Sequence, residues 1–389
     1  MVTPLNNVND IGTQKCVGCF GCCSVCPKHA ITIKKNEKGF FVPKIDNSLC
    51  VNCGVCKSVC FKFNNTTSTG QIMKAFSMSS KDAEILVNSS SGGVSSLLME
   101  ELIKDGFTVI GCSYSVADGC KHVPTNELSD LSSFRGSKYF QSNLSDALQF
   151  IIHTDQKIAF FGLPCQCFAV KKVLEHKKRD LNKVVLVSLM CYGICSPKLW
   201  DLYLEEVQRK RKQNVLGVQF RNKKYGWHVP CIRFDFGNYY LYSRHEGNTF
   251  LDLFYSGQLF NESCYECNAR LSFKNEDIRI GDFWGEKYSK NKDGVSCVLA
   301  VTNKGLSLLN TILNRAVVNE ENCDEIMKGQ AANNERIIDE SISPKMWESI
   351  INGDIEDAHK TLISSLPRSV RMKYKIKQLI KRHERCVKK

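Results

Sequence analysis

The chain has 389 residues, of which 43% are hydrophobic, and it carries a formal net charge of +13. This composition excludes an intrinsically disordered chain and allows two or three packed domains. No run approaches the roughly 18 uninterrupted apolar residues of a membrane span, and the first fifteen residues do not have the pattern of a signal peptide. We therefore expect a cytoplasmic protein, in which 21 cysteines indicate metal or redox chemistry rather than disulfides.

The N-terminal segment holds nine of these cysteines, eight of them in two regular runs. Each run has the spacing C-x2-C-x2-C-x3-C, which is typical of bacterial ferredoxins with two 4Fe-4S clusters. In this arrangement the first three thiolates of a run wrap one cluster, and the fourth cysteine points to the other cluster. The spacing predicts one cluster on Cys16, Cys19, Cys22 and Cys60, and a second on Cys50, Cys53, Cys56 and Cys26.

Zinc is the alternative occupant of these runs, because it also binds four thiolates. Zinc ribbons use separated C-x2-C pairs, however, and the two four-cysteine runs therefore favour the clusters. Cys23 lies outside the spacing, and we expect it to pack rather than to bind metal.

After a polar link that follows Phe63, the chain alternates apolar strand-like runs with helical stretches. This alternation predicts an α/β (mixed α+β) fold with antiparallel strands added around residues 215–243. We expect a dicluster ferredoxin-type domain at residues 1–70, a larger mixed-sheet domain at 71–304 and a helical C-terminal region at 305–389. Within the larger domain we expect helices at 94–104, 168–178 and 198–212, and strands at 107–112, 158–161 and 184–190.

The last segment, residues 368–389, has ten Lys or Arg and one acidic residue, and it supplies +9 of the net charge. A ragged apolar stripe accompanies these charges, formed by Val370, Tyr374, Ile376, Leu379, Ile380 and Val387. A basic amphipathic helix binds anionic lipid or an acidic partner, which makes a peripheral membrane contact one interpretation and a solvated terminus the other. We expect no nucleic-acid binding, because interleaving of aromatic and basic residues is confined to Tyr374.

Five short motifs stand out in the larger domain and carry a family resemblance. They are Ser90-Ser91-Gly92-Gly93, Arg135-Gly136-Ser137-Lys138-Tyr139, Gly162-Leu163-Pro164-Cys165-Gln166, Cys191-Tyr192-Gly193, and Cys264-Tyr-Glu-Cys267 followed by Gly281-Asp282-Phe283-Trp284-Gly285. Behind a dicluster domain, and in this order, they resemble the family of beta subunits of the coenzyme F420 (deazaflavin) hydrogenases and dehydrogenases, from about residue 12 to residue 300. The resemblance implies FAD, a third 4Fe-4S cluster, and electron transfer between a hydride carrier and iron-sulfur partners.

For the third cluster our candidate ligands are Cys165, Cys191, Cys264 and Cys267. The first two each follow an apolar strand, and C-x2-C is the minimal loop that presents two thiolates to one metal centre. The alternative is that these cysteines are small buried hydrophobes. Cys167 and Cys195 lie nearby in the sequence and compete as ligands.

For FAD, the stretch Ser90-Ser91-Gly92-Gly93 opens a helix, where free N–H groups and the helix dipole favour the pyrophosphate. An ordinary helix N-cap is the alternative. Arg135 and Lys138 would neutralise phosphate or the reduced flavin, although two cations in a loop are usually just solvated. The other expected cofactor-binding residues are Ser137, Tyr139, Gly162, Asp282 and Trp284. A G-x-G-x-x-G fingerprint is missing, which leaves a conventional nicotinamide site without support.

Two residues depart from the family pattern. Tyr192 stands where the family usually has His, and Leu163 stands where it usually has Thr, so the deazaflavin itself is not carried over to this chain. We expect an iron-sulfur flavoprotein oxidoreductase that passes electrons between a hydride-carrying small molecule and a redox protein partner or enzyme subunit. The alternatives are a non-catalytic electron-transfer subunit docked to another enzyme, and a membrane-peripheral reductase accessory to surface-polysaccharide biosynthesis.

Overall fold

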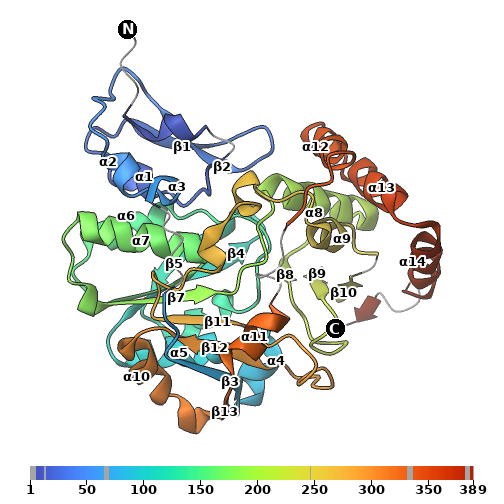
Figure 1. Cartoon of the computed structure of the whole chain (residues 1–389). Coiled ribbons are helices and arrows are strands. Elements are labelled where there is room, and N and C mark those ends of the chain that lie inside the picture. The colour runs from blue at the N-terminus through green and yellow to red at the C-terminus, as the bar shows by residue number, and fades with distance from the viewer. Residues whose placement is uncertain are drawn as a thin grey trace.

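The computed structural model describes residues 6–12, 15–64, 70–245, 247–330, 336–381 and 386–388. Over these residues the strands form one eight-stranded, one four-stranded and one two-stranded sheet. Helices cover the sheets, and the fold is the expected mixture of α and β structure (Figure 1).

The eight-stranded sheet is the centre of the molecule. Its strand order is β13 (Ala316–Glu320), β3 (Lys74–Ser80), β12 (Ser296–Ala300), β11 (Ile278–Asp282), β7 (Val184–Leu189), β6 (Ile158–Gly162), β4 (Thr108–Ser115) and β5 (Gly119–Thr125). The four strands β11, β7, β6 and β4 are parallel, and the strands outside them are antiparallel. Because parallel strands end at the same edge, the carboxyl ends of these four strands meet there, which is where open α/β sheets bind ligands.

Two helical layers cover this sheet. One layer contains α4 (Ala83–Asn88), α5 (Val94–Lys104) and α10 (Asn303–Asn310), and the other contains α6 (Ser145–His153) and α7 (Pro164–His176). Successive residues of β7 alternate between the layers, so that Val185 and Val187 pack towards α5 while Val184 and Leu186 pack towards α7. The strands and helices expected at 94–104, 158–161 and 184–190 are confirmed.

The N-terminal domain lies over the α6–α7 layer (Figure 1). It consists of η1 (Val8–Ile11), α1 (Gly21–Ser24), β1 (Ile31–Lys35), β2 (Phe41–Ile45), α2 (Val55–Ser58) and α3 (Phe61–Asn64). Phe20, Val25 and Val59 belong to the same buried core as the apolar side chains of α6 and α7. This shared core fixes the cysteine runs against the larger domain.

A separate core, rich in aromatic side chains, forms around the fully buried Trp200. It is bounded by β8 (Gly217–Gln219), β9 (Cys231–Asp235), β10 (Tyr239–Arg244), β14 (Cys386–Lys388), α8 (Pro197–Arg211), α9 (Thr249–Ser256), α12 (Ser343–Ile351) and α13 (Ile355–Ser365). The remaining elements are α11 (Cys323–Gly329), α14 (Arg368–Lys381) and the short 3-10 helices η3 (Leu128–Phe134), η4 (Leu181–Lys183), η5 (Glu262–Cys264), η6 (Asn268–Arg270) and η7 (Leu313–Arg315).

The C-terminal region is mostly helical, as expected, but it also adds a strand to each of the two larger sheets, β13 and β14. The domain boundaries near residues 70 and 304 stay predictions. Across the described ranges, no helix combines the length and the apolar character needed to cross a membrane.

Of the two interpretations of the basic tail, the structure has the helix, α14, at Arg368–Lys381, but the apolar stripe proposed for it is not one continuous face. Tyr374 points into the protein, where its hydroxyl contacts Asp252 and His359. Val387 lies in β14, paired with β10. The side chains of Leu379 and Ile380 lie outside the described part of the chain.

Candidate functional site

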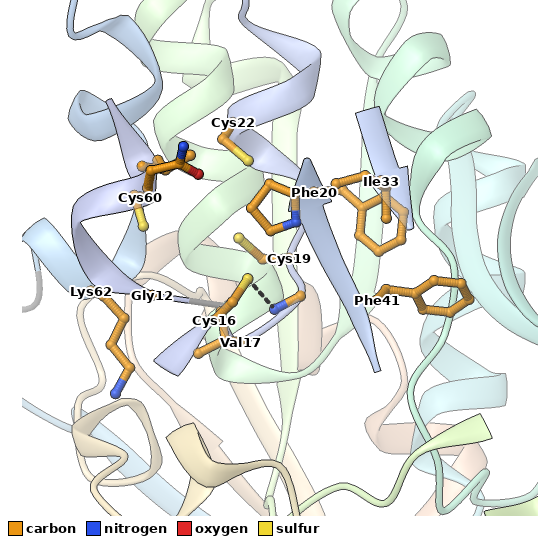
Figure 2. A pocket seen from close by; sticks show the side chains of 14 residues that line it. Gly12, Cys16, Val17, Cys19, Phe20, Cys22, Ile33, Phe41, Cys60 and Lys62 are labelled. Carbon is orange, nitrogen blue, oxygen red and sulfur yellow. Dashed lines mark hydrogen bonds between the residues drawn. The ribbon is translucent and has the colours of Figure 1, made fainter. Parts of the chain in front are cut away.

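The first cysteine group is assembled from both N-terminal runs. Cys16, Cys19, Cys22 and Cys60 line one cavity, and their sulfur atoms point towards it (Figure 2). The backbone N–H of Gly18 donates to the Cys16 sulfur at 3.3 Å. Gly18 has a φ of +64°, and a Cβ there would lie 2.9 Å from the backbone carbonyl oxygen of Phe41, so any other residue would be strained in this loop. Burial raises the pKa of the Cys16 thiol to about 11.

The second group contains the other four cysteines of the two runs. The pKa of the Cys56 thiol is raised by burial and by the nearby thiols of Cys53 and Cys26. The side-chain amide of Asn7 reaches the Cys50 sulfur at 3.7 Å. In both groups the fourth cysteine therefore comes from the other run: Cys60 lies with the first run and Cys26 with the second. Cluster ligation by these residues stays a prediction.

Cys23 packs, as expected, and its thiol donates to the carbonyl of Phe20 at 3.0 Å. Cys53 is exposed, and so are the neighbouring apolar side chains of Leu49 and Val51. The second group therefore lies nearer to solvent than the first.

The four candidate ligands of a third cluster come together although up to a hundred residues separate them. Cys165, Cys191, Cys264 and Cys267 all line one further cavity. The first two follow β6 and β7, whose carboxyl ends lie side by side, and the other two are held by the η5–η6 loop. The predicted grouping is present, and ligation by it stays a prediction.

The two competing cysteines lie elsewhere. Cys167 is fully buried against β7, with its thiol 3.7 Å from the carbonyl of Val187. Cys195 is fully buried in the aromatic core with Phe140 and Trp200.

Zinc, the alternative occupant of the cysteine runs, would require ligand atoms gathered about a single point. In the described ranges no three His, Cys, Asp or Glu side chains are arranged in that way.

A larger cavity of about 360 Å³ opens at the carboxyl ends of the parallel strands. Its volume is typical of small-molecule sites, which measure about 300–1,000 Å³. Six of the eleven predicted cofactor-binding residues line it, namely Ser137, Lys138, Tyr139, Gly162, Asp282 and Trp284. With Cys191, Tyr192 and Gly193, which also line it, the sheet topology thus brings four of the five sequence motifs together around one space.

Two cations face this cavity, the buried Arg221 and the half-buried Lys138. The guanidinium of Arg221 donates to the carbonyl of Trp227 at 3.0 Å and lies 3.7 Å from the Asp282 carboxylate. The Lys138 ammonium donates to the carbonyls of Ser133, Phe134 and Arg135, and burial lowers its pKa. The surplus positive charge suits a ligand with an anionic group.

Aromatic and neutral polar groups complete the cavity wall. Trp284 stacks on Trp227, with ring centroids 5.1 Å apart, and the indole N–H of Trp227 donates to Asp282 at 2.6 Å. His122 contacts the carbonyl of Phe161 and the hydroxyl of Ser142, both at 3.1 Å. Burial lowers the pKa of His122 to about 4, so it is neutral at pH 7.

The other five predicted cofactor residues lie outside the lining found for this cavity in the described structure. Ser90 accepts hydrogen bonds from the backbone N–H and hydroxyl of Ser137, and so supports a lining residue. Ser91 donates to the carbonyl of Val295, and the N–H of Gly92 donates to Ser296. Gly93 is the N-cap of α5 and has a left-handed backbone conformation. Together with these hydrogen bonds it fixes the position of the first turn of α5, where Ser95 lines the cavity. Arg135 forms a 2.6 Å ion pair with Glu84 instead.

The Gly92→Ala substitution tests this packing role. A Cβ at Gly92 would lie 2.1 Å from the carbonyl oxygen of Met78 and 2.7 Å from the backbone nitrogen of Ser296, and neither backbone atom can move away alone. We expect the free energy of unfolding to fall by about 3 kcal/mol, measured by chemical denaturation. Gly119→Ala, with a φ of +73° and open space around it, is the control and should cost only about 1 kcal/mol. Equal losses in the two variants would contradict the packing role.

Sequence reasoning missed several lining residues. Arg221, Tyr255 and Gln330 line the cavity although none of them belongs to the five sequence motifs. Both residues that depart from the family pattern, Leu163 and Tyr192, line the cavity.

The cavities form a continuous series. The large cavity shares Leu163, Gln166, Cys191, Gly193 and Ile194 with that of the third cysteine group. The cavity of the third cysteine group in turn shares Val17 with the cavity of the first group. The Cys19 thiol of the first group also lies close enough to Cys165 to contribute to the raised pKa of that thiol, which burial raises most. α1 and α2 then connect the first group to the second, because Cys22 and Cys56 belong to one core.

Comparison with known proteins identifies two parts of the chain. Residues 155–326 match the family described as the C terminus of the beta subunit of coenzyme F420 hydrogenase/dehydrogenase. Residues 15–63 match the 4Fe-4S dicluster domain.

Three relatives are similar to this chain over half of its length or more. In the F(420)H(2) dehydrogenase of Methanosarcina mazei, the subunit designated F is 24% identical over 224 residues, which cover 54% of this chain and 63% of the relative. The beta subunit of the coenzyme F420 hydrogenase of Methanococcus voltae is 22% identical over 67% of this chain and 88% of the relative. The coenzyme F420-dependent sulfite reductase of Methanocaldococcus jannaschii is 26% identical over 83% of this chain and 49% of the relative.

Among solved structures, the F420-reducing [NiFe] hydrogenase complex from Methanosarcina barkeri contains a chain with a TM-score of 0.47 and 18% identity. The match covers 75% of this chain and 91% of that chain.

Proposed function

Because this chain joins a 4Fe-4S dicluster domain, residues 15–63, to a domain of the family of coenzyme F420 hydrogenase/dehydrogenase beta subunits, residues 155–326, we propose that it is an iron-sulfur flavoprotein oxidoreductase. It passes electrons between a hydride-carrying small molecule and a one-electron protein partner, through FAD and three 4Fe-4S clusters. The single observation that carries this proposal is the series of three adjoining cavities, from the 360 Å³ cavity through that of the third cysteine group to that of the first.

The residues of the large cavity fit a flavin. When bound, a flavin exchanges a hydride with its substrate and single electrons with an iron-sulfur centre. Arg221 and Lys138 supply the positive charge that a phosphate or an anionic reduced ring needs. Trp284 and Tyr139 offer flat apolar surfaces for a ring system, and the neutral His122 keeps further charge out of the cavity.

The wall between the large cavity and the third cysteine group is thin. Leu163 and Cys191 line both cavities, so a ligand against this wall is separated from the cysteine group by single side chains. Leu163 places an apolar side chain at this junction. Tyr192, which also lines the large cavity, donates from its hydroxyl to the carbonyl of Tyr255 at 3.2 Å.

Anaerobic purification with iron, sulfide and flavin counted per chain tests the proposal. About twelve irons and one flavin are expected, and mass analysis of the released flavin distinguishes FAD from FMN. About eight irons without flavin would overturn the proposal. That result would leave a non-catalytic electron-transfer subunit, docked to another enzyme through the surface around the exposed Cys53, Leu49 and Val51.

A second candidate function, as a membrane-peripheral reductase, is favoured by the outer face of α14. Met372 and Ile376 lie one turn apart and are 58% and 52% exposed, on the opposite side of the helix from Tyr374. The exposed Arg368 and Lys375 accompany them. Apolar side chains fixed in solvent beside cations are typical of helices that lie on an anionic lipid surface.

The double substitution Met372→Glu and Ile376→Glu should reduce binding to phosphatidylglycerol vesicles by about tenfold or more, because it replaces inserted apolar groups with charges that the lipid repels. Vesicle sedimentation measures the effect. Leu216→Glu, at a residue that is 69% exposed elsewhere on the surface, is the control and should bind like the unaltered chain. If the unaltered chain does not sediment with anionic vesicles at low salt, the membrane function is wrong.

A further inference from the structure

Arg270 lies at the end of η6, three residues after Cys267, and it is 8% exposed. Its side chain lines the cavity of the third cysteine group, next to Cys191, Cys264 and Cys267. Its Nε donates to the carbonyl of Cys267 at 3.4 Å, and its own carbonyl accepts a 2.6 Å hydrogen bond from Arg279. The backbone and Nε of Arg270 therefore take part in holding the cysteine loop.

The Nη1 atom of Arg270 is different. It is buried and has no hydrogen-bond partner among the described residues. Leaving a buried charged donor unsatisfied costs its full desolvation free energy, so such a group in a folded protein calls for an explanation. Since a loop clamp needs only the backbone and Nε, packing does not explain Nη1. An acceptor inside the cavity does, and the sulfur atoms of an iron-sulfur cluster are such acceptors.

We propose that Arg270 donates a hydrogen bond from Nη1 to the 4Fe-4S cluster held by Cys165, Cys191, Cys264 and Cys267, and thereby raises the reduction potential of that cluster. This inference rests on the proposed third cluster. A cluster gains negative charge when it is reduced, and a cation that donates to its sulfurs stabilises the reduced state more than the oxidised state. Arg270 thus makes the third cluster a better acceptor for electrons from the large cavity.

Arg336 provides the matched comparison. Its charge also lies near this group: burial raises the pKa of Cys191, and Arg336 opposes that rise as Arg270 does. The guanidinium carbon of Arg336, however, lies 4.2 Å from the centre of the Tyr192 ring, and Arg336 is not among the residues that line the cavity of the third cysteine group. Arg336→Gln therefore removes a nearby charge while leaving the Arg270 hydrogen bond in place.

The test is an anaerobic redox titration of the full chain, followed by electron paramagnetic resonance, in the Arg270→Gln, Arg270→Lys and Arg336→Gln variants. We expect R270Q to lower the equilibrium constant for reducing the third cluster about tenfold, which is about 59 mV for one electron. R270K keeps the charge and should recover part of this shift, and R336Q should shift the potential less than R270Q. The two N-terminal clusters serve as an internal reference and should not change.

An unchanged third-cluster potential in R270Q overturns the inference, and so does an equal shift of all three clusters or an equal shift in R336Q. If R270Q does not retain the third cluster, the R270K variant decides. A third-cluster potential below that of the unaltered chain supports the hydrogen bond from Arg270, and a potential equal to that of the unaltered chain overturns the inference. An unaltered chain with about eight irons would instead show that the third cluster, and so the proposed function, is wrong. Iron counting thus separates the two failures.

Discussion

Cys267→Ser is expected to reduce the iron content from about twelve to about eight per chain, with a matching loss of sulfide. Cys267 and its three partners line one buried cavity, in which a serine cannot replace the thiolate as a soft ligand. The two N-terminal clusters should remain, because none of their predicted cysteine ligands lines the cavity of the third group. Because the third group lies between the large cavity and the first group, chemical reduction through the cavity should no longer reach the N-terminal clusters.

Cys167→Ser and Cys195→Ser are the matched controls. Both cysteines are fully buried and close in sequence to proposed ligands, yet both lie in apolar packing outside the third cavity. They should keep about twelve irons and lose only a little stability. Loss of four irons in a control, together with full iron in C267S, would show that the third ligand set is assigned wrongly.

Arg279→Met is expected to lower the free energy of unfolding by about 3–5 kcal/mol. Arg279 is 0% exposed and pairs with the buried Glu276. It also donates to the carbonyls of Ala269, Arg270 and Ser272, which belong to the loop after Cys267. Methionine would leave a buried carboxylate without its counter-charge and would release this loop from β11. Chemical denaturation measures the loss, and iron counting should show that the third cluster is held less tightly.

The double substitution Arg279→Met and Glu276→Gln is the control for the charge. It removes the uncompensated carboxylate, so it should recover part of the lost stability, but it does not restore the carbonyl contacts that hold the loop. If the double variant is no more stable than R279M, the buried charge is not the cause of the loss.

The N-terminal cysteine groups could be predicted from the sequence because their spacing is local. Cys16, Cys19 and Cys22 lie on one tight loop, and the exchange of Cys60 into this group follows from the dicluster pattern. The helix at 94–104 and the buried strand at 184–189 could likewise be predicted from apolar periodicity and runs. These features depend on neighbours in the chain, which the sequence displays directly.

The cavity chemistry depended on tertiary structure. Ser90, Ser91 and Gly92 look like a phosphate-binding turn, but β12 and Ser137 take up their hydrogen bonds. Arg135 and Lys138 look equivalent in the sequence, yet Arg135 pairs with Glu84 while Lys138 faces the cavity. Which polar groups are used by the fold is decided by segments far away in the chain, and no local pattern records it.

By itself, the sequence determined the cysteine spacing of the N-terminal domain, the alternation of strands and helices, and the cysteines from which a third group is built. Only the tertiary structure decided that Cys165, Cys191, Cys264 and Cys267 share one cavity, and that this cavity adjoins both the large cavity and the first cysteine group. The physical reason is that ligand spacing within one loop is a property of the local backbone. The meeting of loops from β6, β7 and η5–η6 is instead a property of parallel strand order, which sets the carboxyl ends of distant strands side by side.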